Sequence, residues 1–183
     1  MIFCGEEKFV SEDYLQTSTG NIISRKATIF KPQAVEIPQG KVIIKDHASV
    51  RGDLATVQIN KYTIVCEGAI LRPSYGIISG GFRYIPLTIG SYCYISANSL
   101  IEAAIIGVGC YIGNNAILSP RCILKDFVRV EDGAVVPPDM VVPPFAIVAG
   151  NPAKIIGEVS ESTSTLAFQE ALARYMAMTP VKR

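Results

Sequence analysis

Aliphatic residues recur every six positions through the C-terminal half of the chain. From residue 89 to residue 148 the spacing is six, apart from one step of five between Ile101 and Ile106. The series is Ile89, Ile95, Ile101, Ile106, Ile112, Leu118, Leu124, Val130, Val136, Val142 and Val148. The residue four places after most of them is small or slender, with Met140 as the large exception. This period fits neither an α-helix nor simple strand alternation, and it is typical of a solenoid whose flat sides are one hexad long.

Three such sides make a coil of 18 residues, so residues 18 apart are predicted to form vertical ladders inside a three-sided prism. Successive coils would stack at the strand spacing of about 4.8 Å. The single short step places Cys93 beneath Cys110 and marks a corner of altered geometry. The predicted ladders of first positions are Ile106/Leu124/Val142, Ile112/Val130/Val148 and Leu118/Val136. The sequence therefore predicts an all-β solenoid, a parallel β-helix of hexapeptide repeats.

The N-terminal half repeats less regularly. Aliphatic residues six apart occur there in two short blocks that are out of phase with each other, and the pattern is lost over a stretch that is rich in Gly. We therefore expect an N-terminal segment at residues 1–26, a β-helix over residues 27–157 and a C-terminal helix and tail over residues 158–183. Within the β-helix, a loop is predicted to leave the coils at about residues 73–86.

A short amphipathic α-helix is predicted over residues 162–178. The stretch begins with a Ser/Thr-rich run that suits helix capping. Apolar residues then follow at helical spacing, namely Phe168, Leu172, Tyr175 and Met176. We expect this helix to lie along one side of the prism.

Composition and charge exclude several kinds of partner. The 183 residues are 49% hydrophobic and 18% charged, which is ample material for a core. Lys and Arg number 17 against 16 Asp and Glu, so there is no basic footprint for nucleic acid and no polybasic run for membrane surfaces. The N-terminus lacks a signal-peptide pattern, and no apolar run approaches the ~18 residues of a spanning helix. A cytoplasmic protein without membrane insertion is expected.

The cysteines show no metal-binding or disulfide pattern. There are five, an odd number, and none forms a CxxC pair. We interpret them as reduced thiols, three of them in the core, and we expect no cofactor. The cysteines are Cys4, Cys66, Cys93, Cys110 and Cys122.

The sixth position of each hexad is expected at the outer corners of the prism, and it is unusually apolar. A solvated surface would carry polar residues there, whereas contiguous apolar surface indicates a contact. Arg129 is the only charge in the series. The predicted interface residues are Tyr94, Leu100, Tyr111, Ile117, Ile123, Val135, Val141 and Ile147. The predicted helix is too short to cover three sides, so the remainder favours a protein partner.

The hexads, together with the closing Gly150-Asn-Pro-Ala-Lys154 segment, resemble the left-handed β-helix superfamily of hexapeptide-repeat acyltransferases and γ-class carbonic anhydrases. This resemblance implies a left-handed coil, which the spacing alone does not show. The Val50-Arg-Gly-Asp53 segment resembles the γ-carbonic-anhydrase-like branch, in which three histidines bind zinc. On that pattern the ligand positions here are Arg72, Ala97 and Glu102, which cannot make a three-imidazole zinc site. Arg72 and Glu102 form an ion pair in our hypothesis.

A resemblance that covers almost the whole chain is to the dynactin subunit 5 family, β-helical components of the dynactin pointed-end complex. The paired prolines Pro137-Pro138 and Pro143-Pro144 are its more specific part, and the first ten and last twenty residues depart from it. Its other segments are Thr19-Gly-Asn21, Arg51-Gly-Asp-Leu-Ala55, Ile70-Leu-Arg-Pro73, Pro86-Leu-Thr-Ile-Gly90 and Arg121-Cys-Ile-Leu-Lys-Asp126.

This resemblance implies a non-catalytic structural or adaptor subunit that supports cargo attachment to dynein and dynactin in microtubule-based transport. The implied partners are dynactin subunit 6, a sister β-helix, together with the pointed-end actin-related protein and dynactin subunit 4. Dynein and cargo adaptors would be contacted indirectly. The implied location is cytoplasmic and associated with the cytoskeleton. Arg51 and Asp53 would then pair within the chain or across a subunit contact.

Two alternatives stay open. A hexapeptide-repeat acyltransferase, expected as a trimer, would need His47 as its general base, because it is the only histidine. The other alternative is an inactive γ-carbonic-anhydrase-like homotrimer that is unrelated to dynein. The oligomeric state discriminates among these hypotheses.

Overall fold

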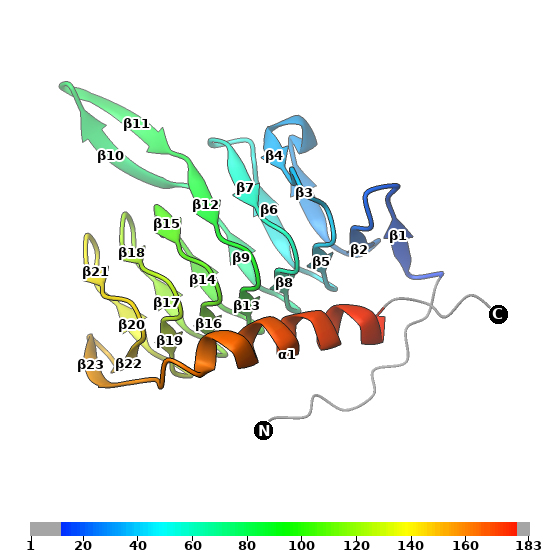
Figure 1. Ribbon diagram of the computed structural model, residues 1–183. Coiled ribbons are helices and arrows are strands. Elements are labelled where there is room, and N and C mark those ends of the chain that lie inside the picture. Colours follow the sequence, from blue (N-terminus) through cyan, green and yellow to red (C-terminus); the bar gives the residue numbers. More distant parts are fainter. Residues whose placement is uncertain (1–11, 179–183) are drawn as a thin grey trace.

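The computed structural model describes residues 12–178, in which short strands wind into a three-sided parallel β-helix (Figure 1). Side A has nine strands: β1 (Tyr14–Gln16), β2 (Ile22–Ser24), β5 (Ile43–Ile44), β8 (Ile64–Val65), β13 (Tyr94–Ile95), β16 (Tyr111–Ile112), β19 (Arg129–Val130), β22 (Ala146–Gly150) and β23 (Ala153–Glu158). Side B has six: β3 (Thr28–Phe30), β6 (Ser49–Arg51), β9 (Ile70–Leu71), β14 (Leu100–Ile101), β17 (Ile117–Leu118) and β20 (Val135–Val136). Side C also has six: β4 (Val35–Glu36), β7 (Val57–Ile59), β12 (Leu87–Ile89), β15 (Ile105–Ile106), β18 (Ile123–Leu124) and β21 (Val141–Val142).

The chain visits the sides in the order A, B, C. From β2 to β22 each coil strand pairs in parallel with the strand of the same side in the next coil, while β1 and β23 add to the two ends of side A as antiparallel strands. The ladders predicted from the sequence are confirmed by the strand register, for example Ile106 with Leu124 and Leu124 with Val142. Ile112 pairs with Val130 in the same way. These first-position side chains point into the prism and are fully buried, so the hydrophobic effect selects the register.

The turns between sides depend on one backbone conformation. The residue at the fourth hexad position has a positive φ in turn after turn, for example +61° at Tyr92 and +64° at Arg121. Such a conformation is disfavoured for non-glycine residues by roughly 1 kcal/mol or more. The turns are nevertheless tied to one another by backbone hydrogen bonds, such as Arg121 N–H to the Glu102 carbonyl at 3.2 Å. Stacking therefore enforces a turn that an isolated hexad would not hold.

The solenoid begins earlier than the sequence indicated. β2 pairs in parallel with β5, so the first coil starts inside the segment assigned to residues 1–26. The hexad period is weak there because Gly20, Asn21 and a 3-10 turn, η1 (Pro32–Ala34), interrupt it. The start of the solenoid is therefore set by the pairing of β2 with β5 and not by a repeated sequence pattern.

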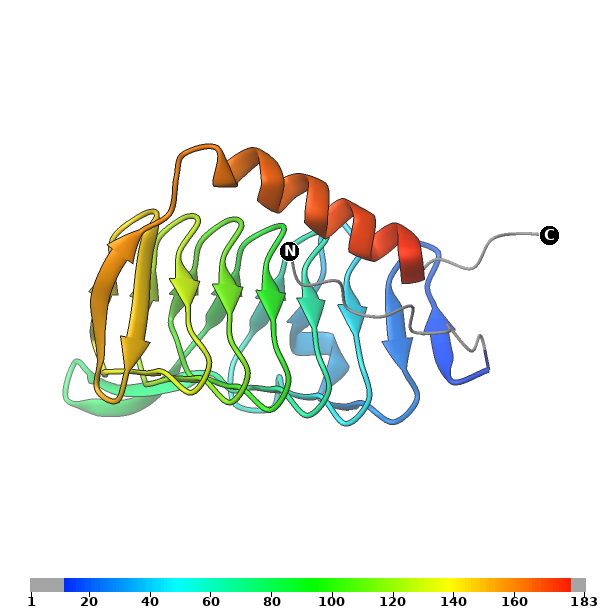
Figure 2. The ribbon, with the colours of Figure 1, turned by 90° about the horizontal axis from the view of Figure 1, so that it is seen from below.

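The stretch at residues 73–86 contains regular structure that the sequence analysis did not predict. β10 (Ser74–Ile78) and β11 (Gly81–Ile85) form an antiparallel hairpin that leaves the corner between sides B and C (Figure 1). Ser79 and Gly80 both have positive φ in the two-residue loop, which is typical of a type I′ turn. Figure 2 shows the hairpin running along the coils at one corner of the prism.

The single described α-helix, α1 (Thr163–Met178), lies along side A, as predicted (Figure 2). Ala171, Tyr175 and Met178 are its buried residues, and the Tyr175 hydroxyl donates a 2.7 Å hydrogen bond to the Gly20 carbonyl. The predicted contact stripe is wrong in part, because Leu172 and Met176 are exposed. The helix runs along the edge of side A, next to the turns that carry Tyr92 and Phe127, and only a narrow stripe of it is buried.

Candidate interaction surfaces and the former ligand positions

Two of the three former ligand positions come together at one end of side B. Arg72 directly follows β9 and Glu102 directly follows β14, and these strands are neighbours in the sheet. The Arg72 guanidinium Nη1 lies 3.3 Å from Glu102 Oε1, so the hypothesised ion pair is formed. Ala97 lies on the turn before β14, at the opposite end of the same strand, where it packs near the helix-covered cluster. The Arg72 guanidinium and the Glu102 carboxylate therefore neutralise each other at positions that zinc ligands occupy in the γ-carbonic-anhydrase-like pattern.

Residues 12–178 contain no cluster of side chains that could bind a metal ion. No group of three His, Cys, Asp or Glu side chains there could hold a metal ion. His47 lies on the exposed turn between β5 and β6 with φ +58°. Its imidazole does not line the cleft beside α1 that is described below.

Arg51 and Asp53 pair within the chain. The guanidinium Nε and Nη2 each donate a 2.8 Å hydrogen bond to one carboxylate oxygen of Asp53, and this pairing holds the pKa of Asp53 below its usual range. The guanidinium also lies over the Phe30 ring at 4.9 Å. Gly52 has no room for a side chain, because a Cβ would meet the Phe30 carbonyl oxygen at 2.8 Å. The segment from Arg51 to Asp53 thus stabilises a turn. A subunit contact through this segment stays a prediction.

The four described cysteines are buried and reduced. The Cys93 thiol points to the Gly107 carbonyl at 3.0 Å and the Cys110 thiol to the Lys125 carbonyl at 3.1 Å. Burial raises the pKa of Cys110 well above its usual value and raises that of Cys122 to about 12. Cys4 lies outside the described residues. Three of the four, Cys93, Cys110 and Cys122, belong to the prism core.

Native thiol labelling checks this arrangement. With iodoacetamide at pH 8, we expect no alkylation of Cys93, Cys110 or Cys122 in the folded protein, because all three thiols are inaccessible and burial raises the pKa of Cys110 and of Cys122. Peptide mass spectrometry should detect full alkylation of all three after denaturation. Rapid modification of Cys122 without denaturant would contradict the structure.

The sixth hexad positions lie on the flat sides, not at the corners as predicted. Seven of them are the first residues of two-residue strands and Ile147 is the second residue of β22, and strand alternation directs them outward while the following residue points inward. The corners are formed by the third and fourth positions instead. Tyr94, Tyr111 and Ile147 are on side A, Leu100, Ile117 and Val135 on side B, and Ile123 and Val141 on side C.

Two apolar ladders are left without a helix over them in the described part of the chain. We define the side B ladder as Ile70, Leu100, Ile117 and Val135, which are consecutive partners in the sheet. We define the side C ladder as Ile105, Ile123 and Val141, which pair in the same way. Val141 is 55% exposed and Ile105 46%. Ile70 and Ile105 were missed by the sequence analysis, although each directly precedes an aliphatic first position.

Side A differs because α1 occupies it. Phe168 contacts both Tyr92 and Phe127, with ring centroids 4.6 Å and 5.6 Å away. Gly109 lies between those two aromatic residues in the stack of turns, and a Cβ there would meet the Phe127 ring at 2.6 Å. The missing side chain leaves the gap over which the helix packs.

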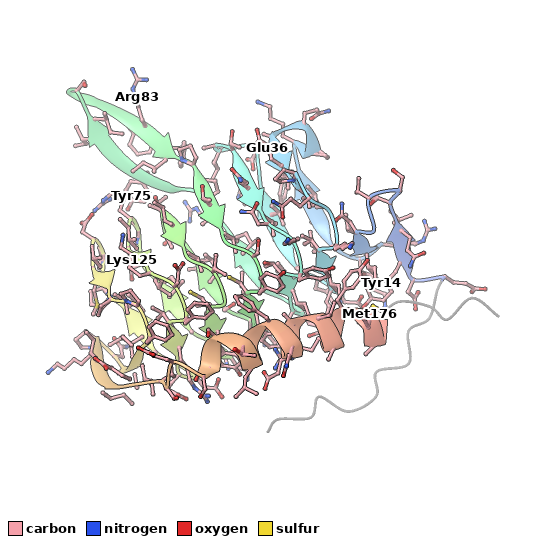
Figure 3. The ribbon with its side chains drawn as sticks, in the orientation of Figure 1. Tyr14, Glu36, Tyr75, Arg83, Lys125 and Met176 are labelled. Atoms are coloured by element: carbon pink, nitrogen blue, oxygen red, sulfur yellow. The ribbon has the colours of Figure 1, made fainter. Side chains whose placement is uncertain are left out.

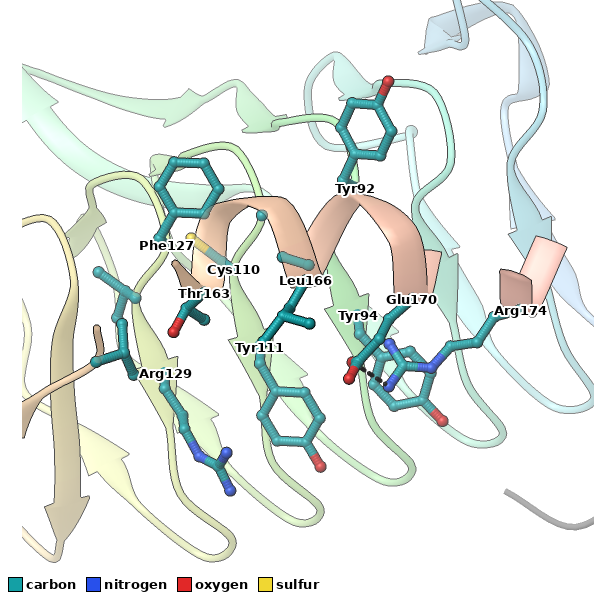
Figure 4. A pocket seen from close by; sticks show the side chains of 14 residues that line it. Tyr92, Tyr94, Cys110, Tyr111, Phe127, Arg129, Thr163, Leu166, Glu170 and Arg174 are labelled. Atoms are coloured by element: carbon teal, nitrogen blue, oxygen red, sulfur yellow. Dashed lines mark hydrogen bonds and ion pairs between the residues drawn. The ribbon is translucent and has the colours of Figure 1, made fainter. Parts of the chain in front are cut away.

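A cleft of about 280 Å³ lies between α1 and side A (Figure 4). Tyr94 and Tyr111 stack in parallel on its sheet wall, with ring centroids 5.6 Å apart. Arg174 lies over the Tyr94 ring at 4.4 Å, and Arg129 lies over the Tyr111 ring at 5.3 Å. Both guanidinium groups are also paired with glutamates, Arg174 with Glu170 at 3.1 Å. The aromatic and guanidinium contacts around the cleft therefore hold the helix against the sheet. Both guanidinium groups are already paired with carboxylates.

The β10–β11 hairpin is fastened to the corner by Arg121. Its guanidinium Nε donates a 2.7 Å hydrogen bond to Asp139, and Nη1 donates a 2.6 Å hydrogen bond to the Tyr75 carbonyl. This pairing lowers the pKa of Asp139. The cross-strand pair Ile77 and Phe82 near the tip is largely exposed. Figure 3 shows Arg83 pointing away from the body at this end of the hairpin.

The inward ladders, the outward sixth positions and the fourth-position turns define the class of protein, a parallel β-helix of the hexapeptide-repeat type, and its likeness in fold to solved hexapeptide-repeat proteins makes it a left-handed one. Solved structures with this architecture resemble it at low identity. AntD, an N-acyltransferase from Bacillus cereus, aligns with a TM-score of 0.67 at 16% identity over 91% of this chain and 93% of that chain. A hexapeptide transferase family protein from Anaplasma phagocytophilum aligns with a TM-score of 0.57 at 17% identity over 83% and 90%. These likenesses concern the fold alone.

Within that class, the chain belongs to the dynactin subunit 5 family, whose family model matches residues 2–183. The dynactin subunit 5 of Dictyostelium discoideum is 40% identical over 99 residues, which are 54% of this chain and 50% of that protein. The match thus spans about half the length of that relative. In residues 12–178, the structure has no helix with the length and hydrophobicity needed to cross a bilayer.

Proposed function

We propose that this chain is a non-catalytic structural or adaptor subunit of the dynactin pointed-end complex and that it contributes to cargo attachment in microtubule-based transport. The observation that carries the proposal is the pair of apolar ladders on sides B and C. Consecutive coils repeat an outward Ile, Leu or Val on both sides. A contiguous apolar surface of this kind is typical of a protein interface.

The chemistry of the former ligand positions supports a role in binding rather than catalysis. Arg72 and Glu102 satisfy each other's charge at 3.3 Å, and His47 stands on an exposed turn. A general base needs a substrate pocket around it, whereas an exposed turn offers the imidazole to bulk water. The structural likeness to acyltransferases, at 15–17% identity for AntD, carries no argument about activity.

The proposed partners follow from family membership. A sister β-helix, dynactin subunit 6, would contact this chain directly, together with the pointed-end actin-related protein and dynactin subunit 4. Dynein and cargo adaptors would be reached through the assembled complex. This role would place the chain in the cytoplasm, associated with the cytoskeleton. The net charge of +1 leaves apolar contact as the main source of affinity.

Affinity purification of the tagged full-length chain from its native organism tests the proposal. We expect a second β-helix chain to co-purify at one to one. Ile117→Asp on side B or Ile123→Asp on side C should reduce a recovered partner by at least about tenfold, because a desolvated unpaired carboxylate opposes docking. Gln58→Asp is the matched control, since it introduces the same charge at an outward position in the polar part of side C.

Three results would contradict the proposal. The first is recovery of the chain only as a homotrimer, and the second is stoichiometric binding of an acyl-CoA by the purified protein. The third is stoichiometric zinc in the purified protein. Thermal unfolding of each variant must match that of the unmodified chain, so that a lost contact is distinguished from a lost fold.

A further inference from the structure

The outward sixth positions of side A are buried in the first three coils, unlike those of sides B and C. Ile22, Ile43 and Ile64 are consecutive partners in the sheet, and they are 0%, 0% and 3% exposed. The same hexad position is 40% exposed at Ile70 on side B and 46% exposed at Ile105 on side C. The three side A residues form a cluster that is separate from the prism core. The outer face of side A is therefore covered along this stretch.

The second hexad positions of side A are buried as well. Lys45, Cys66 and Ser96 each follow an inward residue of the prism core, so strand alternation turns them to the outside. All three are nevertheless buried, although lysine and serine are mostly exposed in proteins. We define the side A strip as these outward residues of both positions, namely Ile22, Ile43, Lys45, Ile64, Cys66 and Ser96.

Helix α1 covers only one edge of the side A strip. It contributes Tyr175 and Met178 to the cluster. Its Phe168 packs on Tyr92 and Phe127, which stand on the turns that lead from side C into side A. The second-position residues of the strip lie at the opposite edge, next to the turns that lead to side B. Among residues 12–178, no second helix and no further layer of strands lies over that edge.

The polar groups of the strip indicate what kind of segment covers it. Ser96 Oγ is buried and has no hydrogen-bond partner among the described residues. Lys45 Nζ lies 3.1 Å from Glu67 Oε1, and the lysine side chain is only 7% exposed. Buried hydroxyl and ammonium groups are normally satisfied by hydrogen bonds. The strip therefore suits a segment that brings apolar side chains together with backbone carbonyls or carboxylates.

We propose that the N-terminal segment, residues 1–11, lies over the side A strip and covers it within the same chain. The segment joins the described chain at Glu12, two residues before β1, which is the N-terminal edge strand of side A. β13, which Ser96 follows, lies four strand spacings from β1, or about 19 Å. Eleven extended residues span roughly 36 Å, so the segment is long enough to pass the whole strip. With side A covered, sides B and C are the faces that stay open to partners.

The composition of the N-terminal segment fits the strip. Five of its residues are large and apolar, and its two glutamates outnumber its one lysine. The apolar residues are Met1, Ile2, Phe3, Phe9 and Val10, and the charged residues are Glu6, Glu7 and Lys8. Apolar side chains would bury the outward isoleucines, and a carboxylate near the Lys45 ammonium would be favourable where water is excluded.

The C-terminal tail is the competing occupant, because residues 179–183 follow Met178 of the same cluster. This tail ends in Lys182 and Arg183, and Val181 is its one aliphatic residue apart from Pro180. Two further cations beside the buried Lys45 ammonium would be repelled where solvent screening is weak. The N-terminal segment is therefore the occupant that the charges and the apolar residues favour.

Alkylation of Cys66 measures the cover, because this thiol lies in the strip and not in the prism core. In the full-length chain at pH 8, iodoacetamide should leave Cys66 largely unmodified. Deletion of residues 2–11 should raise its alkylation rate by at least about tenfold, since thiol reactivity follows access. Deletion of residues 179–183 is the matched control and should change the rate by less than about twofold. Cys93 in the prism core must stay unmodified throughout, which distinguishes local uncovering from unfolding.

A pair of substitutions in the full-length chain tests the same cover without shortening the protein. Phe3→Asp combined with Phe9→Asp places two carboxylates where we expect apolar contacts, and the alkylation rate of Cys66 should again rise by at least about tenfold. Ser11→Asp is the control, because it adds a carboxylate at a polar position of the same segment. We expect it to change the rate by less than about twofold.

Four results would overturn the proposal. The first is rapid alkylation of Cys66 in the full-length chain, and the second is equal protection with and without residues 2–11. Exposure of Cys66 only on deletion of residues 179–183 would assign the strip to the C-terminal tail. Protection that falls on dilution, together with a dimer in sedimentation, would assign it to a second copy.

This inference goes beyond the proposed function and does not depend on it. All of these measurements use the isolated chain, whereas the assembly role is tested by co-purification from the native organism. An uncovered strip would leave the assembly role standing, and loss of the co-purified partner would leave the covered strip standing.

Discussion

Replacement of Gly107 by alanine is expected to lower the free energy of unfolding by about 3 kcal/mol, an overpacking effect at the upper end of its usual range. A Cβ on Gly107 would stand 2.6 Å from the Lys125 carbonyl carbon and 2.7 Å from the Asp126 backbone nitrogen, both in the next coil. It would also meet the Asp126 carboxylate, which accepts a 2.8 Å hydrogen bond from Val108 N–H. Neither backbone atom can move without separating two coils.

Gly81→Ala is the matched control for this change. Gly81 has no positive φ, and the nearest atom to an added Cβ is the Ile78 carbonyl oxygen at 3.9 Å. We expect a change of less than about 0.5 kcal/mol. Urea denaturation followed by circular dichroism measures both variants. A Gly107→Ala protein as stable as the Gly81→Ala protein would contradict the close coil contact.

Truncation of Ile112 to alanine should cost about 3 to 4 kcal/mol, since it removes a fully buried side chain and leaves a cavity. Ile112 pairs with Ile95 in the preceding coil and with Val130 in the following one, and it is 0% exposed. In a solenoid each coil is stabilised mainly by its two neighbours. A cavity in the middle of the stack therefore weakens both interfaces.

Ile77→Ala provides the comparison, because the same truncation at a residue that is 81% exposed removes little buried surface. Its stability should stay within about 0.5 kcal/mol of the original. The prediction fails if the two truncations have equal effects in urea denaturation. Hydrogen exchange of Ile112→Ala should additionally be faster in the adjacent coils than in the first coil.

The period of six predicted the ladders well because it records burial directly. Inward positions such as Ile112 and Leu124 must be apolar, and their regular spacing leaves one arrangement in which all of them are buried. The former ligand positions followed from the resemblance to the γ-carbonic-anhydrase-like pattern, and the structure places Arg72 and Glu102 3.3 Å apart, as the ion-pair hypothesis expected.

The outward positions were harder to place. A sixth-position residue such as Ile117 has the same sequence pattern whether it stands at a corner or on a flat side, and only the positive φ at the fourth position assigns the corner to the turn. The hairpin was missed because Ser79 and Gly80 form its turn within a stretch that had lost the hexad period. Its orientation depends on Arg121, which is far from it in the chain.

The sequence by itself determined the coil, the inward ladders and the loss of a three-histidine site, because each of these depends on which residue type occupies a repeated position. Only the tertiary structure decided where the first coil begins, which side α1 covers and which strands close the two ends of side A. Those features depend on strands such as β1 and β23 that pair outside the repeat. Contacts between segments far apart in the chain have no period, so the sequence pattern cannot reveal them.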